Sequence, residues 1–120
     1  MRKTSFVLMF AMFLIVVAGF AEVSASTPGN IDSCQILDTP GTYILTANIT
    51  NYVGTCFNIT ADNVVLNGNG YTIDGDDSGT DYGIDLIGRT NITVKNFANI
   101  TGFRNGIYLH SSSNNILSNI

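Results

Sequence analysis

The sequence predicts an all-β fold in which short strands wind into a solenoid of about four coils, with no helix after residue 25. The main observation is a repeat, because Gly83-Ile84-Asp85-Leu86 returns 23 residues later as Gly106-Ile107-Tyr108-Leu109. A short fixed period indicates structural units that stack on their neighbours. Within each unit apolar and polar residues alternate, as in strands that bury one face, and Asn or Gly stands where the corners are expected.

The composition after residue 25 opposes helices and excludes one class of partner. This part contains no Glu and no Met, whereas Ile, Thr, Val, Asn and Gly are abundant. β-branched residues favour strands, and Asn and Gly favour turns. It contains three basic residues and eight Asp, which give a formal charge of −5. Because nucleic-acid phosphates require clustered Lys and Arg, we expect no nucleic-acid partner.

Residues 1–25 have the pattern of a removable export signal. Arg2 and Lys3 precede an apolar run from Phe6 to Phe20, and Val23-Ser24-Ala25 offers small residues for cleavage. The run is shorter than the roughly 20 residues of a membrane-spanning helix, although an uncleaved anchor stays an alternative. We therefore expect a secreted or cell-surface protein with no membrane contact beyond this signal. Residues 26–33 would form a polar leader and residues 34–120 the coils.

Cys34 and Cys56 are 22 residues apart, which is about one coil. Residues one coil apart stack at the strand spacing of about 4.8 Å, within the Cα separation that a disulfide needs. Disulfides persist in exported proteins, so the sequence predicts a Cys34–Cys56 bridge between the first two coils. Two buried free thiols are the alternative.

The apolar residues predict three columns that run inward through the stacked coils. The first contains Leu37, Ile59, Leu86 and Leu109, the second Ile44, Leu66, Val94 and Leu117, and the third Ile73 and Ile100. At the corners, Asn63, Asn91 and Asn114 would form a ladder in which each side chain bonds backbone groups of its turn. Since the sequence stops in mid-coil, we expect either an N-terminal piece of a longer solenoid or self-association through the bare strand edge.

Three stretches resemble a known group of proteins. They are Thr39–Tyr43, Ala61–Gly75, and Gly106–Leu109 together with Ser112–Asn115. They are similar to the PbH1 repeats of right-handed parallel β-helix proteins in the pectin-lyase-like superfamily, most closely the NosD-like and "carbohydrate-binding and sugar hydrolysis" types. The resemblance implies the right-handed parallel β-helix fold for residues 34–120. It says little about activity, because this fold hosts lyases, hydrolases, adhesins and copper-enzyme assembly factors.

The Asp-rich loop that follows Ile73 resembles a calcium-binding loop. Oxygen-bearing residues stand at the first, third, fifth, seventh and twelfth positions, with Gly79 at the sixth for the sharp turn. The candidate calcium ligands are Asp74, Asp76, Ser78, Thr80 and Asp85. The loop departs from the usual pattern because Asp85 replaces a bidentate Glu and no helices flank it. A plain Asp/Gly turn is the alternative.

Other residues are candidates for catalysis or ligand binding. Asp76 and Asp77 could act as the acid and base of a glycosidase, but the hydrolase and lyase signatures of the superfamily are not matched. Aromatic faces stack on sugars, so a carbohydrate groove could be lined by Tyr82 and Tyr108 as the first candidates, and further by Tyr43, Tyr71, Arg89 and Arg104. His110 is the single His and is expected to point outward. One His and two bridged Cys argue against copper binding.

Four Asn-Ile-Thr triplets begin at Asn48, Asn58, Asn91 and Asn99 and are candidate glycosylation sites, although Asn-Ile-Thr is also what a coil boundary requires.

The sequence predicts a structural or adhesive β-helix module that binds polysaccharide or a cell-surface glycan. The alternatives are the N-terminal part of a polysaccharide lyase or hydrolase, with its active site downstream, and a NosD-like copper accessory protein. Whether the segment is an enzyme stays open, and its residues favour a non-catalytic role.

Overall fold

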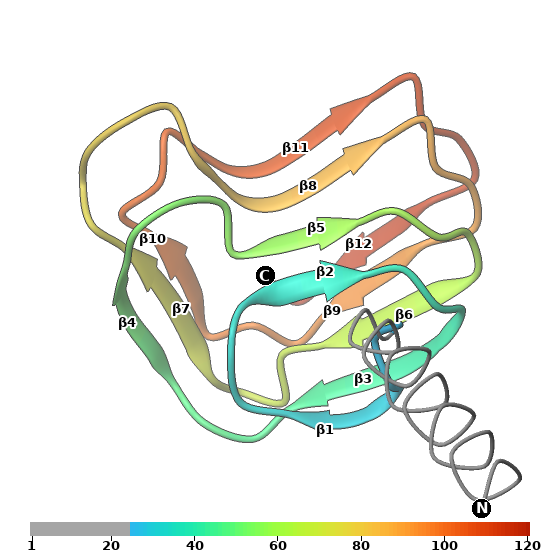
Figure 1. The fold of residues 1–120 in the computed structure, drawn as a ribbon, viewed down its shortest axis with the longest axis horizontal. Helices are drawn as coiled ribbons and strands as arrows, with labels where there is room; N and C mark the ends of the chain where they lie inside the picture. Colours follow the sequence, from blue (N-terminus) through green and yellow to red (C-terminus); the bar gives the residue numbers. More distant parts are fainter. Residues whose placement is uncertain (1–24) are drawn as a thin grey trace, which may run out of the picture.

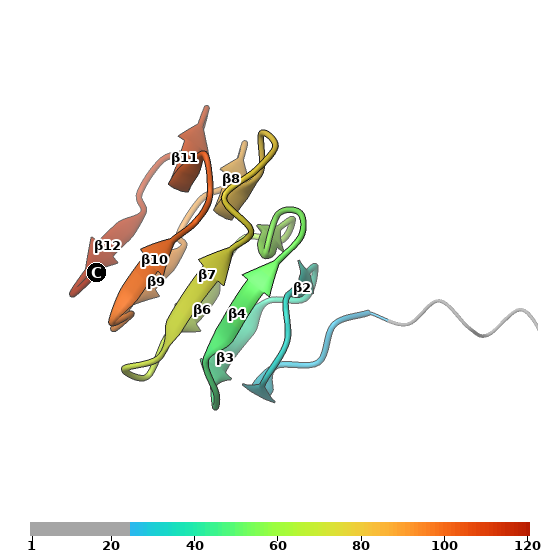
Figure 2. The same ribbon diagram turned by 90° about the vertical axis from the view of Figure 1, so that its left-hand side faces the viewer.

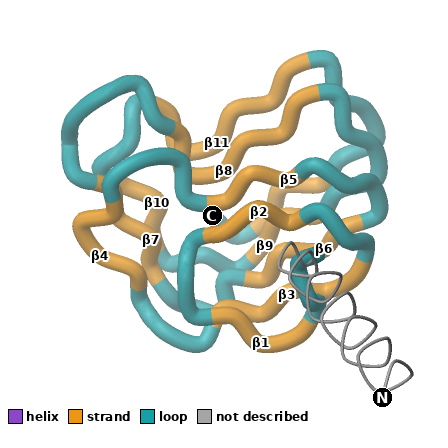
Figure 3. Tube along the Cα trace, viewed as in Figure 1, coloured by secondary structure: helices purple, strands orange, loops and turns teal. Residues whose placement is uncertain are grey.

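A computed structural model describes residues 25–120, so residues 1–24 of the predicted export signal lie outside the described part. The strands are β1 (Gly29–Ile31), β2 (Gln35–Leu37), β3 (Gly41–Leu45), β4 (Ile49–Tyr52), β5 (Phe57–Ile59), β6 (Val64–Asn67), β7 (Thr72–Gly75), β8 (Tyr82–Ile87), β9 (Thr93–Lys95), β10 (Asn99–Thr101), β11 (Asn105–His110) and β12 (Ile116–Ser118). Strands and loops account for all of the described residues, which contain no helix (Figure 3).

The strands form three parallel sheets that enclose a common interior (Figure 1). The first sheet has the order β2-β5-β8-β11, the second β1-β3-β6-β9-β12 and the third β4-β7-β10. The chain visits the three sheets in turn, once per coil, and a view of the third sheet shows its strands side by side (Figure 2). The predicted parallel β-solenoid of about four coils is therefore confirmed. No helix in the described part is long and apolar enough to cross a membrane.

The first and third predicted columns are confirmed by the strand register. Leu37 pairs with Ile59, Ile59 with Leu86, and Leu86 with Leu109. In the third sheet Ile73 pairs with Ile100 and also with Ile49, which the sequence analysis did not include. The members of these columns in the first three coils are almost fully buried, except for the half-buried Ile100. Stacking of coils thus builds a core that no single coil could close.

The second column contains one error. Leu66, Val94 and Leu117 are in register, but the first coil contributes Tyr43 and not Ile44. The corner from Leu37 to Tyr43 is one residue shorter than the corresponding corner from Ile59 to Leu66. A slip of one residue exchanges the two faces of a strand, so Tyr43 is fully buried.

The Asn corners form ladders through side-chain bonds, a correction to the predicted backbone bonds. The Asn91 Nδ2 donates to Asn63 Oδ1 at 2.7 Å. Asn114 does not extend this pair within the described residues. A second ladder joins Asn67, Asn96 and Asn119, in which each Nδ2 donates to the Oδ1 of the preceding coil at 3.2 Å. Four of these five ladder residues have a positive φ, a conformation that Asn tolerates better than most residues.

The predicted disulfide between Cys34 and Cys56 is present, with the two Cα atoms 4.5 Å apart. It ties the first coil to the second. The predicted polar leader contains β1, which pairs with β3 and places Ile31 in the core. At the other end of the stack, Leu109 and Leu117 are 40% and 45% exposed, because no strand follows β11 and β12 within the described residues.

Candidate functional site

The outer face of the first sheet carries a row of side chains that differ in chemistry but share one register. Ile36 pairs with Asn58, Asn58 with Asp85, and Asp85 with Tyr108. Side chains alternate between the two faces of a strand, and the neighbours Leu37, Ile59 and Leu86 point into the core. The row therefore faces outward and crosses all four coils.

Three rings form an aromatic row on this face, made of Tyr82, Tyr108 and His110. The ring centroids of Tyr82 and Tyr108 are 4.6 Å apart, with planes 10° from parallel. The strand register pairs Tyr82 with Asn105 and Tyr108 with Asp85, so the two side chains start three positions apart along the sheet and meet diagonally across neighbouring coils. The rings of Tyr108 and His110 are 6.3 Å apart and 3° from parallel. Two residues advance a strand by about 6.7 Å, so these rings lie side by side.

The stacking of Tyr82 on Tyr108 limits how much of each ring a ligand can reach. Tyr82 and Tyr108 each cover one face of the other, so they do not present two separate faces outward. Tyr82 and Tyr108 are both half-buried, whereas His110 beside Tyr108 is exposed. The outward position predicted for His110 is confirmed.

Asp85 is the carboxylate of this face. Its Oδ1 is buried and accepts no hydrogen bond in the described part of the chain. Burial disfavours the charged form and raises the pKa of Asp85 above its ordinary value. The carboxyl group is half-buried between Asn58 and Tyr108 in the outward row, and its unpartnered Oδ1 is enclosed by the protein.

Apolar and amide groups complete the surface. Ile36 is 57% exposed and Ile87, which pairs with His110, is 53% exposed. The Asn58 side chain makes no hydrogen bond within the described residues, so its amide is free for a ligand. Apolar contact area with a few free polar groups is the usual composition of a small-molecule site.

A glycine at the start of β8 gives the aromatic row its position. A Cβ on Gly83 would stand 2.5 Å from the carbonyl oxygen of Gly106 and 2.6 Å from a methyl group of Ile100. The corner can close against the next coil because residue 83 has no side chain. Tyr82, the first residue of β8, and Asp85 lie on either side of this glycine in the same strand.

Three of the five predicted calcium ligands, Asp74, Asp76 and Ser78, take part in hydrogen bonds. Asp74 accepts a hydrogen bond from the Thr101 hydroxyl at 2.8 Å, and Asp76 accepts one from the Ser78 hydroxyl at 2.7 Å. Asp85 belongs to the outer face of the first sheet. No group of three or more His, Cys, Asp or Glu residues suited to a metal occurs in the described part of the chain. Calcium binding, which would also need Thr80, stays a prediction.

The carboxylates proposed for catalysis have no arrangement that favours them. Hydrogen bonds from the side chain and backbone of Ser78 lower the pKa of Asp76, which suits an ionised loop residue better than a proton donor. Asp77 lines a pocket of about 260 Å³ together with Phe103 and Arg104. This volume is below the range of about 300–1,000 Å³ that is common for ligand pockets.

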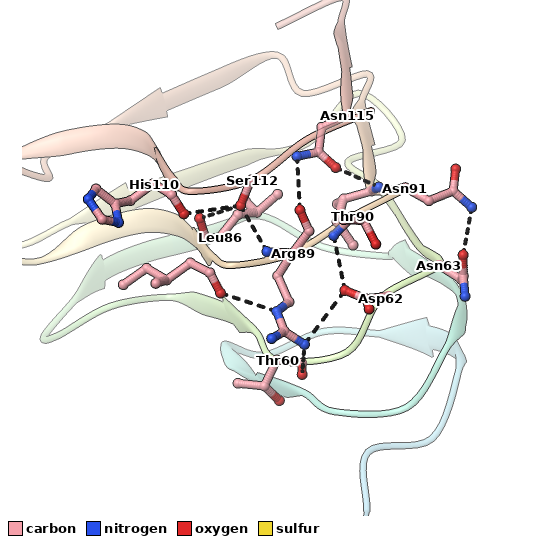
Figure 4. A network of polar contacts seen from close by, with 12 residues as sticks. Thr60, Asp62, Asn63, Leu86, Arg89, Thr90, Asn91, His110, Ser112 and Asn115 are labelled. Carbon is pink, nitrogen blue, oxygen red and sulfur yellow. Dashed lines mark hydrogen bonds and ion pairs between the residues drawn. The ribbon is translucent and has the colours of Figure 1, made fainter.

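Arg89 is engaged in a polar network at the corner between the first and second sheets (Figure 4). Its NH1 donates to the Thr60 carbonyl at 2.8 Å and lies 3.6 Å from Asp62, and its Nε donates to the Ile87 carbonyl at 3.1 Å. Asp62 also accepts the Thr90 N–H at 3.0 Å. Arg89 therefore fastens neighbouring coils, so the guanidinium has few donors left for a sugar.

Among the further residues suggested for sugar contact, the prediction for Tyr43 is wrong. Its ring is fully buried in the second column, and its hydroxyl donates to the Thr39 carbonyl at 2.7 Å. Tyr71 is half-buried against the core, and the exposed Arg104 lies at the pocket near the Asp-rich loop. The outer face of the first sheet thus keeps Tyr82 and Tyr108 from the original set.

Comparisons of the chain with models of protein families, with curated proteins and with solved structures find no match. The fold is therefore established from the strand register alone.

Sequence analysis missed the neighbours of the aromatic row. Asn58 was considered only as a glycosylation site, and Ile36 was given no role. Both lie in one row with Asp85. The signal was available, because the column Leu37, Ile59 and Leu86 implies that the residues one position earlier share the outer face.

Proposed function

We propose that this chain is a β-solenoid binding module with a structural or adhesive role, which binds polysaccharide through the outer face of the first sheet. The observation that supports it best is the aromatic row, in which the stacked rings of Tyr82 and Tyr108 lie beside the exposed His110. The apolar C–H faces of sugar rings pack on aromatic rings, while free amides and carboxyls accept or donate hydrogen bonds to sugar hydroxyls.

The shape of this face suits a polymer better than a small molecule. The row from Ile36 to Tyr108 crosses four coils, a distance of about 14 Å at the usual strand spacing. The face is open, so each sugar would make few contacts. An extended ligand can occupy several such positions at once, and linked weak contacts add up to useful affinity.

The proposal includes export to the cell surface or the medium. The Cys34–Cys56 disulfide supports it, since disulfides persist in oxidising compartments and are rare in the cytosol. The lyase, hydrolase and copper-accessory alternatives have no observation of their own in the described residues, so they are not developed.

The test compares the exported full chain with two single variants in affinity gels that contain dextran, polygalacturonate or chitosan, which are neutral, acidic and basic. We expect at least one polysaccharide to retard the native chain. Tyr108→Ala should weaken that retardation about three- to tenfold, the value of one aromatic contact. Tyr52→Ala is the matched control, because it removes a tyrosine from the third sheet.

Two results would contradict the proposal. One is that none of the three polysaccharides retards the native chain. The other is that Tyr108→Ala and Tyr52→Ala behave alike while both variants remain folded by circular dichroism. In the second case the aromatic row would be a ladder that stabilises the sheet and not a binding surface.

A further inference from the structure

Two of the four Asn-Ile-Thr triplets occupy equivalent positions on the third sheet. One triplet runs from Asn48 into β4, and the other, Asn99–Thr101, is β10 itself. Ile49 pairs with Ile73 and Ile100 pairs with the same Ile73, so one coil separates the two triplets. Two strand spacings place them about 10 Å apart on one face.

In both triplets the modifiable amide is directed outward and available. The central isoleucines point inward, and Asn48 and Asn99 are exposed. The Asn48 Oδ1 accepts the Thr72 N–H at 2.9 Å, which leaves the amide nitrogen without a partner in the described part of the chain. The Asn99 side chain makes no hydrogen bond among the described residues.

The other two triplets differ in this respect. The Asn91 Nδ2 donates to Asn63 Oδ1 at 2.7 Å, so this amide nitrogen is already engaged in a ladder contact. Asn58 is half-buried in the middle of the first sheet, between Ile36 and Asp85. A glycan there would lie across two neighbouring coils.

We infer that the outer face of the third sheet carries N-linked glycans at Asn48 and Asn99, whereas Asn58 and Asn91 stay unmodified. In the reaction the amide nitrogen bonds to the anomeric carbon of a sugar and loses one proton. The bond between that carbon and the phosphate of a lipid-linked sugar donor breaks, and the phosphorylated lipid leaves. The cell's own glycosyltransferase and donor supply this chemistry, and the chain supplies the acceptors.

The inference stands apart from the proposed function, because it concerns a different sheet. The two are compatible, since glycans on the third sheet would leave the outer face of the first sheet uncovered. Either can fail without the other, because one is measured by sugar attached to the chain and the other by retention on added polysaccharide.

The experiment is peptide mass mapping of the full chain secreted from cells that glycosylate Asn-X-Thr. Enzymatic removal of glycans in heavy-oxygen water marks each formerly modified Asn as an isotopically heavy Asp. We expect the mark at Asn48 and Asn99 in most copies and not at Asn58 or Asn91. A reference protein with a known sequon, secreted from the same cells, verifies that the machinery is active.

Four single variants make the assignment independent of peptide coverage. Thr50→Ala and Thr101→Ala remove the two proposed acceptor triplets without changing the Asn, and each should lower the intact mass by one glycan. The matched variants Thr60→Ala and Thr93→Ala should not change the glycan mass. A lost glycan in either matched variant, or an unmodified native chain beside a modified reference protein, would overturn the inference.

Discussion

Leu66→Ala is the most direct test of whether stacked coils hold this protein together. Leu66 is fully buried in the second column, with Tyr43 on one side and Val94 on the other. The substitution removes three carbon atoms from a position that both neighbouring coils enclose, so the space left behind cannot collapse completely. The expected loss in the free energy of unfolding is about 3 kcal/mol.

Leu117→Ala is the matched control, because it makes the same chemical change in the same column. Leu117 pairs with Val94 on one side and is 45% exposed. Only about half of its area leaves water on folding, and no closed cavity results from its removal. We therefore expect a loss of about 1 kcal/mol.

The measurement is urea unfolding of the exported chain with its disulfide intact, followed by far-ultraviolet circular dichroism. With a slope of about 1.5 kcal/mol per molar, the midpoint should fall by about 2 M urea for Leu66→Ala and by less than about 1 M for Leu117→Ala. Equal losses in the free energy of unfolding for the two variants would refute the argument that the cost depends on how deeply the leucine is buried. If the loss for Leu117→Ala grew with protein concentration, the open end of the stack would be buried by self-association through its strand edge.

Three further predictions address the disulfide, a glycine and a carboxyl group. Replacing both Cys34 and Cys56 by Ser should cost about 3 kcal/mol, since the bridge closes a 22-residue separation, and an unchanged urea midpoint would contradict this estimate. Gly83→Ala should cost at least about 2 kcal/mol, because its Cβ would meet the Gly106 backbone at 2.5 Å, whereas Gly106→Ala meets its nearest atom, an Ile100 methyl group, at 3.3 Å and should cost less. Burial raises the pKa of Asp85, so the native state holds this proton more tightly than the unfolded chain does. The resulting stabilisation is complete below the ordinary pKa of 3.8 and is lost as the pH rises through the raised pKa. Asp85→Asn should therefore be more stable than the native chain at neutral pH and lose this advantage in acid, and a pH-independent difference would count against the burial of the carboxyl group.

The fold could be predicted because a solenoid is specified locally. The 23-residue repeat, the alternation within strands and the Asn or Gly corners all act within one coil, and each coil contacts only its neighbours. The first column and the disulfide followed by counting residues between coils, and both are confirmed.

The candidate site was predicted in part. Tyr82 and Tyr108 were selected as aromatic residues that could line a carbohydrate groove, and the structure brings them together. Their mutual stacking depends on the side-chain conformations of two coils at once. Likewise, the sequence analysis gave Arg89 as a candidate for sugar contact, but its partners Thr60 and Asp62 belong to the preceding coil.

The sequence by itself determined the strand pattern, the number of coils and the faces of most strands, because these follow from local alternation and a fixed period. Only the tertiary structure decided that Tyr43 and not Ile44 enters the core, since one corner is shorter by a residue. It also decided that Asp74 of the Asp-rich loop accepts a hydrogen bond from Thr101 of the third sheet. Corner length and side-chain contacts between coils depend on packing across the stack, and no single repeat contains that information.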